Sequence, residues 1–183
     1  MFRYLILLLL IFCIQSLFAQ SSETLKVRDY RSKNEHAIIN EFVSFLSIPN
    51  VAADTLNIKK NAAFIMEMMH NRGIDKVQLL SAVTKGAAPA VYGEVIVPGA
   101  KNTIIFYAHY DGQPVNAAQW AKELDPFTPK LFTADLNNGK SIAFPDAGTY
   151  DPQWRIYARG SSDDKAGVAA ILNAYDAIVK SGM

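Results

Sequence analysis

The chain has 183 residues, a usual length for one domain and enough to bury a hydrophobic core. Half of the residues are hydrophobic and 19% are charged, a composition typical of globular proteins. The formal net charge is +1, so the composition gives no support for binding to nucleic acid or to an anionic membrane surface.

Residues 1–19 have the pattern of a secretory signal peptide. Arg3 supplies a positive charge, and residues 4–14 form an uninterrupted apolar run. Ala19 is the predicted last residue of the segment that is removed. The apolar run is short for a membrane span, which leaves an uncleaved anchor as the alternative. We therefore expect a secreted or periplasmic protein that has no membrane contact after cleavage.

The single cysteine, Cys13, lies inside this predicted signal peptide. Residues 20–183 contain no cysteine, so the predicted mature protein has no disulfide and no thiolate chemistry. Without Arg3, the numbers of basic and acidic residues become equal at 17 each. The predicted mature protein is therefore neutral and does not depend on the redox state of its compartment.

Two helices are predicted in the N-terminal half, after a polar leader over residues 20–33. Apolar residues recur at helical spacing over 34–47. A second helix is predicted over 57–71, with Gly73 as its C-terminal stop. Three methionines of this helix are interpreted as core side chains, because nothing else nearby suits a soft metal: Met66, Met68 and Met69.

Three strand-forming stretches come next: residues 76–83, 90–97 and 103–108. The turn sequence at 98–102 predicts that the last two stretches pair as a hairpin. Residues 116–154 are rich in turn formers, and we expect a long excursion that contains one short hairpin. A strand over 155–159 and a final helix complete the chain. This order of elements predicts an α/β fold.

The stretch TIIFYAHYDGQPV, residues 103–115, ends an apolar strand in a histidine and a carboxylate. Binding sites of open α/β sheets form beyond the carboxyl ends of the strands. His109 by itself is also compatible with a buried core histidine. Asp111 can face the same side of the strand, and a metal-bound imidazole usually donates its second N–H to such a carboxylate. The pair therefore favours a metal ligand with an orienting partner.

The stretch RGSSDDKAG, residues 159–167, comes directly before the final helix. Asp163 or Asp164 could simply cap the helix, whose N-terminal N–H groups favour a carboxylate. A phosphate loop is disfavoured, because the pattern GxxxxGK[ST] is absent. Two adjacent acids at the rim of a sheet suit a divalent cation better.

Three further polar residues have a more ordinary interpretation. His36 and His70 lie on predicted helices, where we expect surface positions. Arg159 could bind a substrate carboxylate, but a structural salt bridge is the commoner role for such an arginine. We therefore assign none of the three to the predicted metal site.

The two stretches together, HxDxxP and then RGxxDDKxG about fifty residues later, resemble the motifs of the di-zinc exopeptidases. This family includes carnosinase, glutamate carboxypeptidase, aminoacylase and succinyl-diaminopimelate desuccinylase. HYDxQPV, followed by Trp120 and the sequence DPFTP at 125–129, is most similar to the carnosinase-like dipeptidases. The resemblance covers residues 34–183. It implies that residues 20–183 are the N-terminal portion of a three-layer α/β/α catalytic domain, without the lid or dimerisation domain.

The resemblance also implies roles for individual residues. His109 matches a ligand of one zinc ion, and Asp163 matches the carboxylate that bridges two zinc ions. Asp111 matches the catalytic-site residue that orients the ligand histidine. The peptide bond after the bridging aspartate is often cis in this family, so we expect a cis bond between Asp163 and Asp164. Asp164 itself is assigned to the local hydrogen-bond network or to the helix cap.

The activity implied by the resemblance is metal-dependent hydrolysis of peptide or amide bonds in dipeptides or short peptides. Two Zn²⁺ ions would polarise the scissile carbonyl and activate a water, and a glutamate would take the proton. The substrate would be a peptide, and a homodimer is possible for the full-length protein. Gly112 and Ala166 depart from the family pattern, without touching a predicted ligand.

The other implied ligands and the glutamate base would follow residue 183, which leaves His109 and Asp163 as the ligands in this sequence. A catalytic zinc needs at least three protein ligands. We therefore expect residues 1–183 alone to bind metal weakly and to be inactive. The alternative interpretation is a non-catalytic fragment or binding module that retains half of the metal site.

Overall fold

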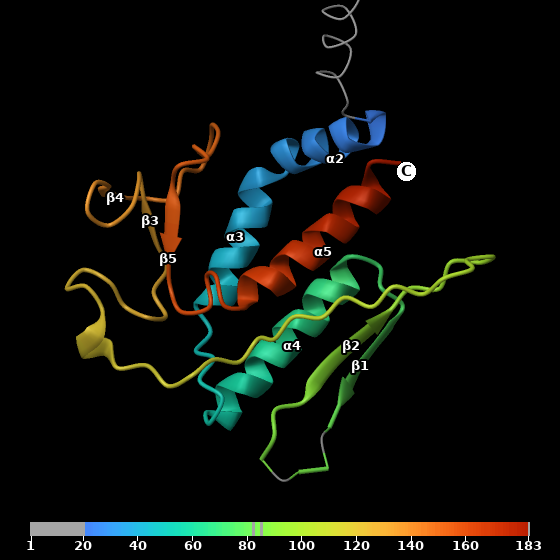
Figure 1. Cartoon of the computed structure of the whole chain (residues 1–183), viewed down its shortest axis with the longest axis horizontal. Helices are drawn as coiled ribbons and strands as arrows, with labels where there is room; N and C mark the ends of the chain where they lie inside the picture. The colour runs from blue at the N-terminus through green and yellow to red at the C-terminus, as the bar shows by residue number, and fades with distance from the viewer. Residues whose placement is uncertain (1–20, 82, 85, 183) are drawn as a thin grey trace, which may run out of the picture.

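The computed structural model of the chain describes residues 21–81, 83–84 and 86–182, so the predicted signal peptide lies outside the described part. Its elements, in chain order, are α2 (Ser22–Lys33), α3 (Glu35–Leu46), α4 (Thr55–Asn71), β1 (Lys76–Leu80), β2 (Ala90–Glu94), the 3-10 helix η2 (Ala117–Gln119), β3 (Lys130–Phe132), β4 (Ser141–Ile142), β5 (Arg155–Tyr157) and α5 (Lys165–Lys180) (Figure 1). This mixture of helices and strands agrees with the predicted α/β class. Among the described residues, no helix combines the length and the apolar content that a membrane crossing requires.

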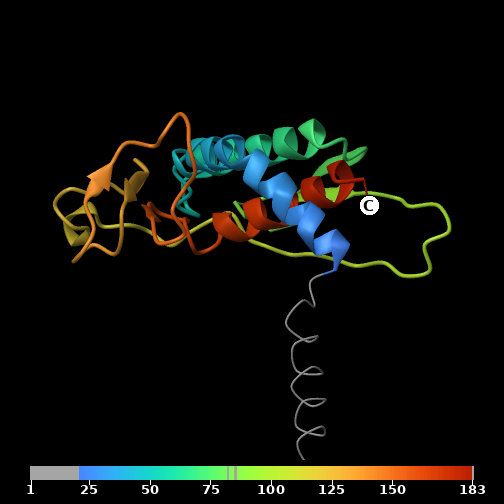
Figure 2. The same ribbon diagram turned by 90° about the horizontal axis from the view of Figure 1, so that it is seen from above.

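The strands form two small antiparallel sheets. One consists of β1 and β2, and the other has the order β4–β3–β5. Figures 1 and 2 show the two sheets on opposite sides of the molecule, with α3, α4 and α5 between them. The short hairpin predicted within residues 116–154 is confirmed, because β3 and β4 pair in this way.

The hydrophobic core lies where α3, α4 and α5 meet the β1–β2 sheet. Phe45 at the end of α3 is fully buried and stacks on Phe64 of α4, with ring centroids 5.5 Å apart. Met68 of α4 and Leu172 of α5 belong to the same buried cluster. Burying one such side chain contributes about 1.5–3 kcal/mol. The interpretation of the methionines as core side chains is confirmed for Met68, and Met69 packs against the same cluster.

Helix α4 has local signals at both ends. The Asp54 carboxylate accepts a hydrogen bond from the backbone N–H of Asn57 (3.1 Å), so the helix begins two residues before the predicted start. Gly73 follows the helix with a φ of 72°, a left-handed conformation that glycine adopts readily. The predicted C-terminal stop is therefore confirmed.

The polar leader predicted over residues 20–33 is wrong, because most of it forms helix α2. Ser21 caps this helix by accepting a hydrogen bond from the backbone N–H of Thr24 (3.3 Å). Lys33 and Asp29 form an exposed ion pair one turn apart (2.7 Å). The sequence of α2 has no apolar stripe that would predict a helix. In agreement with this, no residue of α2 is buried.

The predicted hairpin between residues 90–97 and 103–108 is also wrong. β2 pairs with β1, and this pairing places Gly93 opposite Val77. Residues 103–108 are extended, but no backbone hydrogen bond joins them to another described segment (Figure 1). An apolar pattern predicts an extended segment without identifying the strand beside it.

The apolar face predicted for the final helix is partly correct. Val168 and Leu172 of α5 are buried as expected, whereas Ile178 and Val179 are about half exposed. Asp176 is buried in their place, because it belongs to an ion-pair network at the C-terminal end of α5. The sequence pattern alone gives no indication of this buried carboxylate.

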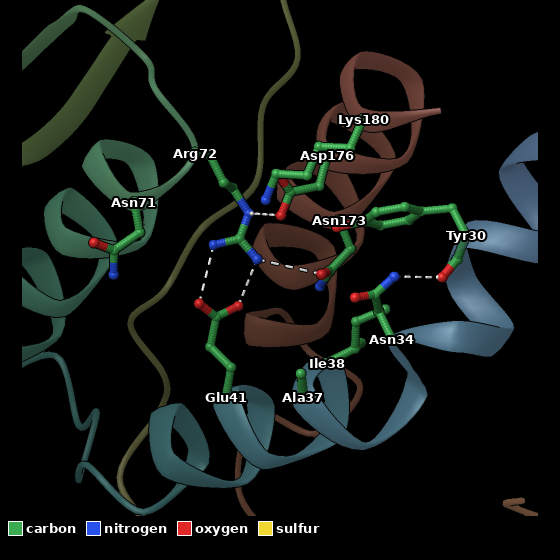
Figure 3. A pocket seen from close by; sticks show the side chains of 10 residues that line it. All are labelled: Tyr30, Asn34, Ala37, Ile38, Glu41, Asn71, Arg72, Asn173, Asp176 and Lys180. Carbon is green, nitrogen blue, oxygen red and sulfur yellow. Dashed lines mark hydrogen bonds and ion pairs between the residues drawn. The ribbon is translucent and has the colours of Figure 1, made fainter. Parts of the chain in front are cut away.

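Arg72 joins three helices through that network (Figure 3). Its guanidinium donates to both carboxylate oxygens of Glu41 on α3, at 3.0 and 2.6 Å, and its Nε lies 3.1 Å from Oδ2 of Asp176 on α5. Burial by itself lowers the pKa of Arg72, but the charges and hydrogen bonds of Glu41 and Asp176 outweigh it and raise the pKa. The guanidinium therefore stays charged and fixes α3 and α5 relative to α4.

Candidate metal centre

The two motifs predicted from the sequence meet in the structure. His109 follows the extended segment 103–108, and Asp163 lies in the loop that leads into α5. Nε2 of His109 is 3.0 Å from Oδ1 of Asp163. The peptide bond between Asp163 and Asp164 is cis, as predicted. An imidazole nitrogen and a carboxylate oxygen therefore lie side by side where a cation could bind both.

The second ring nitrogen of His109 faces Asp111. Nδ1 is 3.0 Å from the backbone carbonyl oxygen of Asp111 and 3.3 Å from its carboxylate Oδ1. Both atoms are acceptors, so Nδ1 carries the proton and donates it. In a neutral ring this leaves the Nε2 lone pair for a metal, whereas in a protonated ring Nε2–H donates to Oδ1 of Asp163. The orienting role predicted for Asp111 fits this contact, although the backbone carbonyl is the nearer acceptor.

The charges around His109 favour its protonated form. Burial of the ring lowers the pKa of His109, but the Asp111 carbonyl and the carboxylates of Asp111 and Asp163 together outweigh burial and raise it. The Asp163 side chain is 79% exposed, so it remains open to solvent. The centre thus presents concentrated negative charge, which suits a cation.

Asp164 contacts the main chain of the other motif. Its Oδ2 accepts a hydrogen bond from the backbone N–H of His109 (3.2 Å). Asp164 occupies the N-cap position of α5 but makes no side-chain cap bond there. A Cβ atom at position 167 would lie 2.3 Å from Oδ1 of Asp164, so Gly167 leaves the room that this carboxylate needs. Asp164 therefore belongs to the local hydrogen-bond network, which was one of its two predicted roles. It does not form the helix-cap hydrogen bond that was the other.

Lys165 is a positioning residue that the sequence analysis missed. It is fully buried, and its Nζ donates to the backbone carbonyls of Phe45 (2.6 Å) and Ile48 (2.7 Å). Phe45 lies in the last turn of α3 and Ile48 lies two residues beyond its end, where backbone acceptors lack partners within the helix. Lys165 thereby fixes the start of α5, and with it the neighbouring aspartates, against α3.

Asn50 supports the other side of the centre and was also missed. Its backbone carbonyl accepts from the N–H of Gly112 (2.7 Å), and its side-chain Nδ2 donates to the carbonyl of Tyr110 (2.9 Å). A Cβ atom at position 112 would lie 3.0 Å from Nε of Arg159. Gly112, which departs from the family pattern, therefore gives space to the Arg159 side chain. A lone asparagine at a helix–loop junction has no distinctive sequence signal.

The three remaining polar candidates have mixed outcomes. His36 is only half exposed, because its ring nitrogens lie 3.0 Å from the carbonyl of Pro145 and 2.8 Å from that of Gly148. The surface position predicted for His36 is therefore met in part, whereas His70 is exposed as predicted. Arg159 donates to the carbonyl of Gln113 (3.3 Å), and no ion pair involves it within the part of the chain that the structure describes. The salt bridge expected for Arg159 is thus not formed there.

His109 and Asp163 offer donor atoms of the types that zinc binds, but two ligands are too few for a complete zinc site. Imidazole nitrogen and carboxylate oxygen are both ordinary zinc ligands. However, no group of three or more His, Cys, Asp or Glu side chains within the described ranges could hold a metal ion. The roles of His109 and Asp163 as metal ligands stay a prediction, and the described residues supply half of a site.

A cavity of about 220 Å³ lies elsewhere, between α2, α3, α4 and α5 (Figure 3). Its walls include Glu41, Arg72 and Asp176, whose charges pair with one another. Neither His109 nor Asp163 lines it. The cavity is therefore separate from the candidate metal centre.

Comparisons with known proteins identify similar sequences and a similar fold. Residues 105–183 match the model of peptidase family M20/M25/M40. The Cys-Gly metallodipeptidase DUG1 of Candida albicans is 28% identical over an alignment of 149 residues, with a coverage of 75% of this chain and 27% of that protein. The structure of the di-peptidase Dug1p from Saccharomyces cerevisiae superposes with a TM-score of 0.66 at 19% identity, over 88% of this chain and 32% of that one.

The predicted resemblance to the exopeptidases is thereby confirmed. Both motifs lie inside the stretch that matches the family model. Residues 105–183 are similar to peptidase family M20/M25/M40, and the chain is similar in sequence or fold to the two dipeptidases named above. It spans about a quarter to a third of the length of the relatives described above.

Proposed function

We propose that the protein containing this chain hydrolyses peptide or amide bonds in dipeptides or short peptides, with two zinc ions as cofactors. The observation that carries the proposal is the 3.0 Å approach of His109 Nε2 to Asp163 Oδ1. These residues come from two motifs that match the family in order, and the chain matches the M20 model over both. The proposed substrate class follows the name of the Candida albicans relative, a Cys-Gly metallodipeptidase.

Each residue of the centre has a distinct proposed task. His109 and Asp163 would hold the metal, and zinc would supply Lewis-acid activation of the carbonyl and of a water when bound. Asp111 would accept from Nδ1–H of His109 and so leave the Nε2 lone pair for the metal. Asp164 fixes the backbone of His109, and Lys165 fixes the start of α5. The last two contacts hold the ligands at their observed separation.

The proposal is tested by dipeptide hydrolysis with the protein as its own gene produces it. We expect hydrolysis of dipeptides such as Cys-Gly that is lost with a chelator and restored with zinc. His109→Ala and Asp163→Ala should abolish the activity, and Asp111→Asn should reduce it about 10–100-fold. His70→Ala is the matched control, because His70 is an exposed histidine of α4. Full activity in Asp163→Ala would overturn the metal-ligand assignment.

A second candidate function is a peptide-binding module without catalysis. The observation that favours it is the presence of only two of the predicted ligands in the described site. The same assay separates the two functions. A binding module would retain dipeptides in equilibrium dialysis and show no zinc-dependent hydrolysis, whereas a peptidase would release the amino acids.

We also propose that the protein is exported, with residues 1–19 removed. The support is the sequence pattern of a charged residue, an apolar run and Ala19. N-terminal sequencing of the protein recovered outside the cytoplasm should give Gln20 as the first residue. Recovery of the unprocessed chain, with Met1 as the first residue, would contradict this.

A further inference from the structure

His36 in the first turn of α3 contacts the connection between β4 and β5. Its Nδ1 is 3.0 Å from the carbonyl oxygen of Pro145, and its Nε2 is 2.8 Å from that of Gly148. Both residues belong to the segment 143–154, which we call the strap. The contacts join positions that are 109 and 112 residues apart in the sequence, so they help to place the strap against α3.

The two contacts require two donors from one imidazole ring. A carbonyl oxygen can only accept a hydrogen bond. A neutral imidazole has one N–H and one lone pair, so either tautomer would turn a lone pair towards one of the two carbonyls. The imidazolium has an N–H on both nitrogens and can donate to both. The observed geometry therefore suits the protonated ring of His36.

Glu35, the neighbour of His36, binds the strap as well. Its Oε1 accepts a hydrogen bond from the backbone N–H of Tyr150. The Tyr150 ring lies beside the His36 ring, with centroids 5.3 Å apart, and meets the Trp154 ring edge-on at 5.8 Å. Two adjacent side chains of α3 therefore fix the strap, one as an acceptor and the other as a donor.

Several ionisable groups lie around the His36 contact: Glu35 on α3, Asp146 and Tyr150 on the strap, and Lys33 at the end of α2. Burial and the charges of Glu35 and Asp146 raise the pKa of Tyr150, so its phenol stays neutral near pH 7. Lys33 forms an exposed ion pair within α2. Carboxylates and amines ordinarily change charge outside the range of pH 5–8, whereas an imidazole changes its charge inside it. The contact therefore responds to pH in this range through His36.

We propose that His36 is a pH-dependent clasp, which holds the strap on α3 in the imidazolium form and releases it when the ring loses one proton. Contact with the strap favours the doubly protonated ring, because both carbonyls then receive a donor. By linkage, the bound proton equally favours the contact. The clasp is therefore complete below the pH range in which histidines titrate, and it is lost as the pH rises through that range. This inference does not depend on the proposed peptidase activity.

Release of the strap would affect the segment that carries Asp163. The strap ends at Trp154, and β5 follows directly. In its sheet β5 pairs with β3, and Asp163 comes six residues after Tyr157, the last residue of β5. The strap is therefore a second support for this segment, in addition to the pairing with β3. We expect residues 158–163 to become more mobile when the clasp opens.

The test is amide hydrogen exchange of the strap at pH 5.5 and at pH 8, measured by mass spectrometry on the protein as its own gene produces it. Each measured rate is compared with the intrinsic exchange rate at the same pH, which gives a protection factor. We expect the protection factor of the strap to be at least about 10-fold larger at pH 5.5, because hydrogen bonds from a charged donor are the stronger ones. Equal protection at the two pH values, or larger protection at pH 8, would overturn the proposal.

A pair of substitutions assigns the effect to one histidine. His36→Gln keeps an amide that can donate but does not titrate, and His70→Gln is the matched control at an exposed histidine of α4. We expect His36→Gln to remove the pH dependence of the protection of the strap, and His70→Gln to preserve it. A pH dependence that persists unchanged in His36→Gln would contradict the clasp.

Exchange within α4 separates opening of the strap from general unfolding, because α4 contributes to the hydrophobic core and not to the clasp. At each pH, we expect the protection of α4 to be the same in the wild type and in both variants. His36→Asn, which also lacks a titrating group, is the second variant for the case in which His36→Gln lowers the protection of α4.

Discussion

His109 and Asp163 are 54 residues apart in the sequence, and Nε2 of the first lies 3.0 Å from Oδ1 of the second. The approach depends on two further contacts, because Asp164 binds the backbone N–H of His109 and Lys165 binds the end of α3. The neighbours of Asp163 therefore build the centre as much as the two predicted ligands do.

Gly167→Ala should destabilise the protein, although alanine normally favours a helix over glycine by about 1 kcal/mol. The new methyl group would lie 2.3 Å from Oδ1 of Asp164 and displace its carboxylate from the His109 N–H. We expect a loss of about 1–3 kcal/mol in the free energy of unfolding, measured by urea denaturation. In an Asp164→Ala background the same substitution should be neutral or stabilising. An equal loss in both backgrounds would contradict the contact.

Lys165 should make stability depend on pH. Burial lowers the pKa of Lys165 to about 7, whereas an unfolded lysine titrates near 10.5. Between these values the unfolded chain binds more protons than the folded one, so the free energy of unfolding should rise with pH. The limiting slope is about 1.4 kcal/mol per pH unit, measurable by urea denaturation between pH 7 and 9.

Lys165→Met is the control for this pH dependence. The substitution should remove the rise, and at pH 9 it should cost about 1–3 kcal/mol, because the carbonyls of Phe45 and Ile48 lose their donor. A wild-type stability that is flat or falling over this pH range would show that the buried amine is fully charged at pH 7.

Arg72→Leu should be one of the most destabilising single substitutions in the described part of the chain. It would leave Glu41 and the buried Asp176 without the guanidinium that neutralises them. The expected cost is about 3–5 kcal/mol in the free energy of unfolding, measured by urea or thermal denaturation. Lys76→Leu is the matched control, because Lys76 forms an exposed ion pair with Glu94 and should cost less than about 1 kcal/mol. Similar costs for both variants would contradict the role of Arg72.

Local signals of the sequence predicted the local structure well. Gly73 marks the end of α4, Met68 lies in the core, and the long turn-rich excursion contains one short hairpin. The motif around His109 and the motif around Asp163 meet as predicted, including the cis bond to Asp164. Each of these features depends on a pattern within a few residues, or on motifs that are recognised by their residue types and their order.

Features that depend on distant partners were not predictable in the same way. Helix α2 has no buried residue, so the sequence shows no amphipathic pattern for it. Lys165 binds carbonyls 117 and 120 residues earlier, and a lysine in a helix ordinarily indicates a surface position. Residues 103–108 have the apolar pattern of a strand, but no backbone hydrogen bond joins them to another described segment. In each case, tertiary contacts that the local sequence does not encode decide the outcome.

The central claim, that His109 and Asp163 are metal ligands, is tested most directly by zinc titration of the chain followed by NMR of its imidazoles. The sequence contains three histidines, His36, His70 and His109, so each resonance can be assigned. We predict that zinc shifts the resonances of His109 at lower concentration than those of the other two. Asp163→Ala should weaken this effect at least about 10-fold. Unchanged His109 resonances at zinc concentrations that shift His36 or His70, or equal zinc binding in Asp163→Ala, would contradict the assignment.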